Sequence, residues 1–321
     1  MEILQVVDRF WLGFGIALFA NIVIAISNTV RKKAVIRREY VPLENEDKYI
    51  HYKDWVLWVS VVLMLIAQAI NFIAFSLAPA FLIAATGVIG IFLTAIMWKI
   101  FYGEIFNYVG FAGLIFSILG LAMMVLNYPK REITLTVSGL AALMDQTGLI
   151  YYVIAVVILY LLTACYIVPH FGTKCVSVYV IFSLVTYSFV GSVAIIFCKC
   201  AGYSIKYLIV TGNQEEANIL YMLLFLLVSI VAVGIQEIYM AKFTNSFTSA
   251  STVKAIFFIL RTALVAVFSD LLFSEWSQVR DLKIVGTSIG FVLISIGALL
   301  HPLFSDYSFD DAVIGDKFRP R

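Results

Sequence analysis

About nine long apolar runs constrain the fold of this chain more than any other feature of its sequence. Each run has about 20 residues, the length that an α-helix needs to cross the hydrocarbon core of a bilayer. The runs are Phe10–Val30, Trp55–Leu77, Ala80–Tyr102, Phe106–Asn127, Leu149–Val168, Val176–Phe197, Ile219–Met240, Thr248–Phe273 and Ile284–His301. With 62% hydrophobic and 13% charged residues over 321 positions, the composition excludes an ordinary water-soluble domain. We therefore expect an all-α, polytopic membrane protein.

The distribution of Lys and Arg predicts the orientation of the chain in the membrane. The segment from Arg31 to Lys53 is the richest in basic residues, and such segments favour the cytoplasmic side, where they contact lipid headgroups. This loop is expected to bind no nucleic acid, because it has no fold of its own. Nine spans then place the N-terminus outside or in a lumen and the C-terminus in the cytoplasm. The first run is expected to remain as an anchor, because Glu2 and Asp8 precede it instead of the basic region of a signal peptide.

Three features occur twice in the same order along the chain: a polar pair within an apolar run, an acid at the end of the next run, and a pattern of small residues in the run after that. The copies are Gln68-x-x-Asn71, Glu104 and Gly110 to Gly120 in one part, and Gln236-x-x-Tyr239, Glu275 and Gly286 to Gly297 in the other. An odd number of crossings separates the copies, so the predicted repeat is inverted. Inverted repeats are typical of secondary transporters, whose substrate site lies between the halves near the bilayer midplane.

This repeat divides the single transmembrane domain of residues 1–321 into two pseudo-symmetric halves. The first half comprises residues 10–127 with four spans, and the second comprises residues 149–301 with five. An interfacial linker is predicted at 128–148 and a cytoplasmic tail at 302–321. Trp55 and Trp98, near span ends, are expected in an interfacial aromatic belt.

A motif at the junction of the second and third runs, Asn71-Phe72-x-Ala74-Phe75-x-x-Ala78-Pro79-Ala80, begins a series of matches to a known family. The others are Gly87, Glu104, Gly172…Tyr179, Lys199…Gly202, Gln236-x-x-Tyr239-x-x-Lys242 and Phe273-x-Glu275-Trp276. In order and spacing they resemble the NIPA-type magnesium transporter family, a branch of the drug/metabolite transporter superfamily, over about residues 10–300. The resemblance implies a carrier for Mg²⁺ or another divalent cation in a plasma or endosomal membrane. Nothing in it implies a cofactor.

The sequence departs from the family pattern close to the expected site. Gln68 stands where the family usually has Glu, so the second run lacks an acid. Thr-Pro pairs that the family places in the third and eighth runs are Ala84-Ala85 and Val253-Lys254 here. Without the prolines, we expect those two helices to run uninterrupted, without unwound carbonyl groups to face an ion.

Three ionisable residues, Glu237, Lys254 and Arg261, lie deepest within the apolar runs, where each costs a few kcal/mol unless it is paired or hydrated. Lys254 and Arg261 are seven residues apart on one helical face, so both can face one cavity. Two cations beside one acid would repel Mg²⁺ and favour an anionic or organic metabolite. Alternatively, Glu237 forms an ion pair with one of them that simply satisfies both charges.

The sequence thus leaves open a cation transporter, a carrier of another solute with the same fold, and a membrane scaffold that no longer transports. The candidate substrate-binding residues are Gln68, Asn71, Gln236, Glu237, Tyr239, Lys254 and Arg261. Gln68 and Asn71 share one helical face and are expected either to line the site or to hold neighbouring helices together. The expected partners are the lipid bilayer and a small charged solute. We predict no enzyme, because the sequence contains no catalytic motif or metal-ligand pair.

Overall fold

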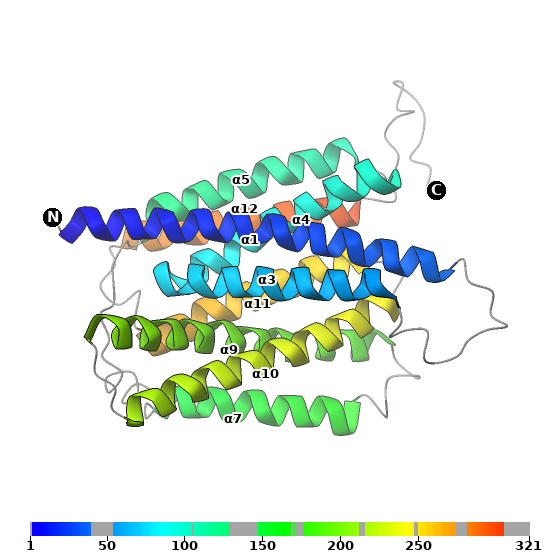
Figure 1. Ribbon diagram of the computed structural model, residues 1–321. Coiled ribbons are helices and arrows are strands. Elements are labelled where there is room, and N and C mark those ends of the chain that lie inside the picture. Colours follow the sequence, from blue (N-terminus) through cyan, green and yellow to red (C-terminus); the bar gives the residue numbers. More distant parts are fainter. Residues whose placement is uncertain are drawn as a thin grey trace.

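The computed structural model describes residues 2–39, 54–104, 106–128, 147–167, 170, 176–211, 216–246, 250–273 and 281–304, and within these ranges it is helical with short connections. The helices are α1 (Glu2–Glu39), α3 (Trp55–Leu77), α4 (Ala80–Tyr102), α5 (Tyr108–Asn127), α7 (Thr147–Leu162), the one-turn π-helix η2 (Thr163–Ile167), α9 (Val176–Thr211), α10 (Glu216–Ser246), α11 (Ala250–Phe273) and α12 (Asp281–Leu303). They lie roughly side by side as a bundle (Figure 1). The prediction of an all-α, polytopic membrane protein is confirmed.

Eight helices in the described ranges are long and apolar enough to cross a membrane. The fifth predicted run corresponds to α7 followed by η2, of which only the shorter stretch Ile150–Leu162 is an apolar α-helix. The bounds of α3 and α4 agree with the sequence prediction. The predicted linker and tail lie almost entirely outside the described residues.

Helix α1 does not end with the predicted apolar run at Val30 but continues to Glu39. At about 1.5 Å per residue, this helix is roughly 57 Å long, well beyond the roughly 30 Å of the hydrocarbon core. Arg, Lys and Glu are good helix formers, so the basic sequence after Val30 continues the helix once lipid no longer surrounds it. The same reasoning applies to α9, which continues past Phe197 to Thr211.

The chain turns sharply between α3 and α4 at Ala78 and Pro79. Ala78 is extended, with φ −135° and ψ 164°, as expected of a residue that precedes proline. Its N–H still donates to the Ala74 carbonyl, 3.0 Å away, and Pro79 accepts from the Ile83 N–H at 3.1 Å. Gly13 of α1 packs against this corner so closely that a Cβ there would lie 3.0 Å from the Cβ of Ala78.

Helices α5 and α12 pack against each other through their small residues, in antiparallel directions. A Cβ added to Gly120 would lie 2.5 Å from the Gly290 carbonyl oxygen, and one added to Gly113 would lie 2.7 Å from that of Gly297. Backbone therefore meets backbone, as in small-residue contacts between membrane helices generally. The two small-residue patterns that the sequence presents as copies of a repeat are thus partners in space. The inverted repeat itself stays a prediction, which this pairing of the last helix of each half supports.

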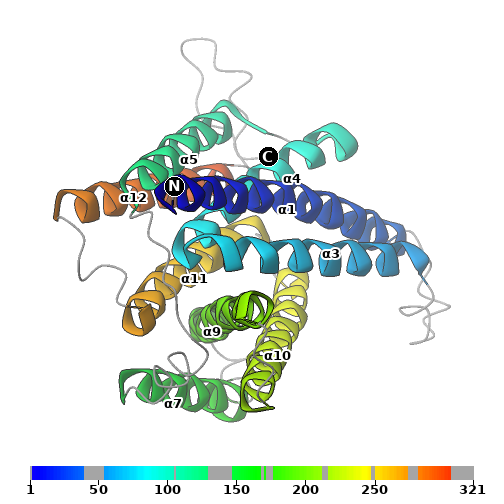
Figure 2. The ribbon, with the colours of Figure 1, turned by 60° about the vertical axis from the view of Figure 1, so that its left-hand side comes forward.

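Helix α9 occupies the middle of the second half, with α3, α7, α10 and α11 around it (Figure 2). Its side chains Ser183, Thr186, Ser188 and Ser192 are all fully buried. Thr186 and Ser188 donate to backbone carbonyls four residues earlier, which is how a buried hydroxyl in an apolar helix is satisfied. Its central position brings the side chains of α9 against α10 and α11, the two helices that carry the predicted charges.

The close packing of α5 against α12 predicts that a larger side chain at the contact lowers the stability of the protein. Gly120→Ala should lower the free energy of unfolding by about 1–3 kcal/mol, because the new methyl group would meet the Gly290 carbonyl and the Ile294 N–H. Gly15→Ala is the matched control, since a Cβ at Gly15 meets nothing within 4 Å. Unfolding of the detergent-solubilised protein, titrated with a denaturing detergent, measures both. Equal stability of the two variants would contradict close backbone packing at this site.

Candidate functional site

The candidate site lies at one end of the bundle, where α1 and α4 end and α11 begins. We call this the Lys32 end. Glu237 of α10 is partly buried there and interacts electrostatically with Arg31 of α1 and with Lys254 and Arg261 of α11. The acid therefore lies within electrostatic range of cations on α1 and α11, and among the described residues none of them forms an ion pair with it. Because the intervening medium is less polarisable than water, these interactions are stronger than those between surface charges.

Trp98 of α4 lies between two lysines from different halves. The Nζ of Lys32 is 4.0 Å from the centre of the Trp98 ring, and the Nζ of Lys254 is 5.2 Å from it. Lys32 also forms a hydrogen-bonded ion pair with Glu104, just beyond the end of α4. A cation over an indole face is stabilised by the ring quadrupole, more so where water is scarce. Trp98 is therefore partly buried beside two cations near the end of α4, and its place in an interfacial belt stays a prediction.

Gln236 and Arg261 meet at Gly191 of α9, which is what allows α9, α10 and α11 to approach one another. A Cβ at Gly191 would lie 2.6 Å from Oε1 of Gln236 and 2.8 Å from Cδ of Arg261. Gln236 is 4% exposed. The guanidinium of Arg261 is 5.6 Å from the centre of the Phe257 ring, and its buried Nε has no hydrogen-bond partner among the described residues. The Arg261 side chain thus retains an unused donor deep in the bundle.

The seven predicted site residues have different outcomes. Four of them, Gln236, Glu237, Lys254 and Arg261, belong to one electrostatic and packing cluster. Gln68 and Asn71 of α3 are partly buried, and the described contacts do not place them in that cluster. The backbone of Tyr239 lies in α10, but its side chain is outside the described residues.

The sequence reasoning missed a second polar contact, between α1 and α4. Asn21 is 4% exposed and donates to the Ala17 carbonyl at 2.9 Å and to Oγ1 of Thr86 at 3.0 Å. Gly90 makes room for it, since a Cβ there would lie 2.9 Å from Oδ1 of Asn21. The rule that singled out Gln68 and Asn71, an amide within an apolar run, would have found Asn21 as well. Its hydrogen bonds here join helices, which is the structural use of such an amide.

The chemistry of this cluster is that of a charge site and not of a dedicated metal centre. In the described part of the chain, no group of three or more His, Cys, Asp or Glu side chains is placed to hold a metal ion. The cluster has one carboxylate, that of Glu237, which follows the amide Gln236 in the sequence and interacts electrostatically with Arg31, Lys254 and Arg261. Helices α4 and α11 are uninterrupted, as the missing prolines predict, so neither presents unwound carbonyl groups. A solute at this site would therefore contact side chains and not backbone carbonyl groups.

Comparison with known proteins identifies related sequences. Residues 8–306 match the model of the family described as "Magnesium transporter NIPA". The chain is 28% identical to magnesium transporter NIPA3 of Pongo abelii, with 92% of this chain and 71% of the relative aligned. It is also 28% identical to NIPA4 of Mus musculus over 92% and 72% of the two chains, and 26% identical to probable magnesium transporter NIPA3 of Arabidopsis thaliana over 90% and 77%. No solved structure matches significantly.

The charge cluster predicts that substitutions at Glu237 and at the neighbouring cations have strongly coupled effects on the free energy of unfolding. Glu237→Gln should lower the free energy of unfolding by about 3 kcal/mol, because it leaves cations within the bundle without their counter-charge. Adding Arg261→Gln to that variant should recover more than about 1 kcal/mol, since one of the uncompensated charges is removed. A double-mutant cycle on the unfolding free energy in detergent measures both. A coupling near zero would mean that Glu237 is hydrated and unpaired.

Proposed function

The chain belongs to the magnesium transporter NIPA family, and from this membership we propose that it carries Mg²⁺, or another divalent cation, past Glu237 at the contact between its two halves. It is a multi-pass membrane transporter of the NIPA type. The observation that carries the proposal is that Glu237, an acid within α10, faces charged side chains of both α1 and α11. A group placed between two halves is one whose surroundings change when the halves move.

Mg²⁺ suits such a site because it gives up water reluctantly and usually binds only one or two carboxylates. A partly hydrated ion would need Glu237 as its one charged ligand, with amide oxygens, such as that of Gln236, accepting hydrogen bonds from its water molecules. Without the ion, the neighbouring cations Arg31, Lys254 and Arg261 compensate Glu237. Binding of Mg²⁺ would displace them, so exchange of cations at one carboxylate links ion binding to movement of α1 and α11.

Other residues complete the proposed path. Gln68, Asn71 and Tyr239 remain candidates for its walls because they are polar, and Asn71 and Tyr239 also belong to the matched motifs. We also propose that the Lys32 end faces the cytoplasm, with the N-terminus on the opposite side, as the basic residues after Val30 favour. The transporter family supports a carrier role and not an enzymatic one.

An anionic solute is a second candidate, and the excess of cations favours it. Arg31, Lys254 and Arg261 surround a single acid, and Nε of Arg261 has no partner among the described residues. A carboxylate or phosphate accepts from a guanidinium and gains from the positive potential, whereas a divalent cation is repelled by it.

Transport by purified protein tests the main proposal. Proteoliposomes that enclose a fluorescent Mg²⁺ indicator should take up Mg²⁺ faster than empty vesicles, and Glu237→Gln should reduce the rate at least tenfold, because it removes the one charged ligand. Vesicles with folded wild-type protein but no flux above background would refute Mg²⁺ as the solute.

A single substitution separates the two candidates by the sign of its effect. Lys254→Gln removes a positive charge that interacts with Glu237. It should raise the rate of Mg²⁺ uptake severalfold if the solute is a cation, and lower uptake of the transported anion if the solute is an anion. Lys99→Gln is the control, because Lys99 is an exposed lysine near the same end of α4. Parallel uptake assays with Mg²⁺ and a panel of labelled carboxylates and phosphates provide the measurement.

A further inference from the structure

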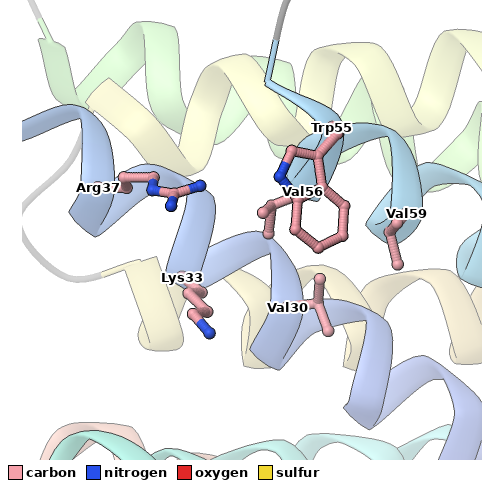
Figure 3. Close-up of a pocket in the computed structure, with 6 residues that line it drawn as sticks. All are labelled: Val30, Lys33, Arg37, Trp55, Val56 and Val59. Carbon is pink, nitrogen blue, oxygen red and sulfur yellow. The ribbon is translucent and has the colours of Figure 1, made fainter.

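A groove with an almost entirely apolar lining surface, to which two basic residues contribute, lies on the outside of the bundle, between α1 and α3 at the Lys32 end. It has a volume of about 250 Å³ and is lined by Val30, Lys33 and Arg37 of α1 and by Trp55, Val56 and Val59 of α3 (Figure 3). None of these residues belongs to the charge cluster around Glu237, so the groove is a separate feature of the molecule.

Lys33 and Arg37 supply the positive charge of this groove. They are four residues apart on α1 and therefore on one helical face. Both are exposed, and within the described ranges neither forms an ion pair or a hydrogen bond. In Figure 3 the Arg37 side chain extends from α1 toward α3. Arg31 and Lys32, on the same turn of α1 as Lys33, add to the local positive potential.

The groove changes in character along its length. From Val30 to Lys33 to Arg37, α1 advances by about 10 Å toward its end, at about 1.5 Å per residue. On the other wall, α3 begins at Trp55 and continues deeper to Val56 and Val59. The exposed Lys33 and Arg37 therefore place their charged groups at the outer end of the groove, outside its apolar lining surface. Trp55, which is 68% exposed, stands at the junction, where tryptophan is typical of the headgroup level of a bilayer.

This order of groups matches a phospholipid, whose charged headgroup and apolar chains are joined in the same sequence. We propose that the groove binds an anionic phospholipid, with the phosphate between Lys33 and Arg37 and the first part of an acyl chain along Val30, Val56 and Val59. A free phosphate ion would gain nothing from the apolar walls. Non-specific contact of a lysine side chain with lipid headgroups would not require an adjacent apolar groove. Basic pockets between membrane helices are known to bind anionic lipid headgroups.

Binding is measured with full-length, delipidated protein in a neutral detergent, by titration with dioctanoyl phosphatidylglycerol and mass spectrometry of the intact complex. The double substitution Lys33→Gln/Arg37→Gln should weaken binding about 30-fold, from about 1 kcal/mol for each basic residue. Val59→Trp, which fills the apolar part but keeps both charges, should weaken it by a similar factor. Lys99→Gln, at an exposed lysine near the same end of the bundle, should leave it within twofold.

Three results would overturn the proposal. The first is equal loss of binding in Lys99→Gln, which would indicate general attraction to basic residues. The second is unchanged binding in Val59→Trp, which would exclude the apolar part. The third is competition by inorganic phosphate at the lipid's own concentration, which would indicate a free-anion site. A variant is included only if its unfolding temperature without lipid equals that of the wild type. If the double variant fails to fold, Arg37→Gln alone should weaken binding about fivefold.

Discussion

Compensation of the Glu237 carboxylate is the interaction on which the Lys32 end of the bundle depends. An acid within a membrane-spanning helix is costly unless opposite charge or water is close to it. Here Arg31 on α1 and Lys254 and Arg261 on α11 interact with the carboxylate electrostatically, and among the described residues none of them forms an ion pair with it. Because α1 and α11 lie far apart in the sequence, these interactions link distant parts of the chain. Trp98 reinforces the contact, since its ring is shared by Lys32 from one half and Lys254 from the other.

Elsewhere the bundle is held by a different kind of contact. Between α5 and α12, glycine backbones meet directly, and nothing ionisable lies at the contacts of Gly113 and Gly120. Such close packing stabilises a membrane protein without a hydrophobic driving force, because dispersion and weak backbone interactions act over a short distance. A rigid, apolar pairing of α5 with α12 and an electrostatic contact at the Lys32 end are suited to different roles. The first can hold the halves together while the second rearranges.

The sequence was sufficient to predict the architecture, because hydrophobic length determines where a chain crosses a bilayer. It predicted α3 and α4 to the residue, whereas α1 and α9 continue as helices beyond the predicted apolar runs, because helix propensity persists after the apolar sequence ends. It also identified Gln236, Glu237, Lys254 and Arg261 by the cost of burying them. It could not predict that Arg31 and Trp98 join them. Both lie near span ends, where a charge or an indole is common, and only tertiary packing brings Arg31 into electrostatic range of Glu237 and Trp98 beside Lys254.

The position of Gln68 gives the charge at Glu237 its significance. An acid at that position of α3, as in the family pattern, would give a divalent cation a second negative group in the first half. This chain has a neutral amide there and an acid on α10, so the negative charge lies in the second half, close to its own cations. Attraction of Mg²⁺ then requires that Glu237 be separated from Arg261 and Lys254. Ion affinity and the packing of α10 against α11 are therefore opposed. Under the proposed function, the ion would be bound most tightly in whichever state moves those helices apart, and that dependence is what a transporter needs to couple binding to conformational change.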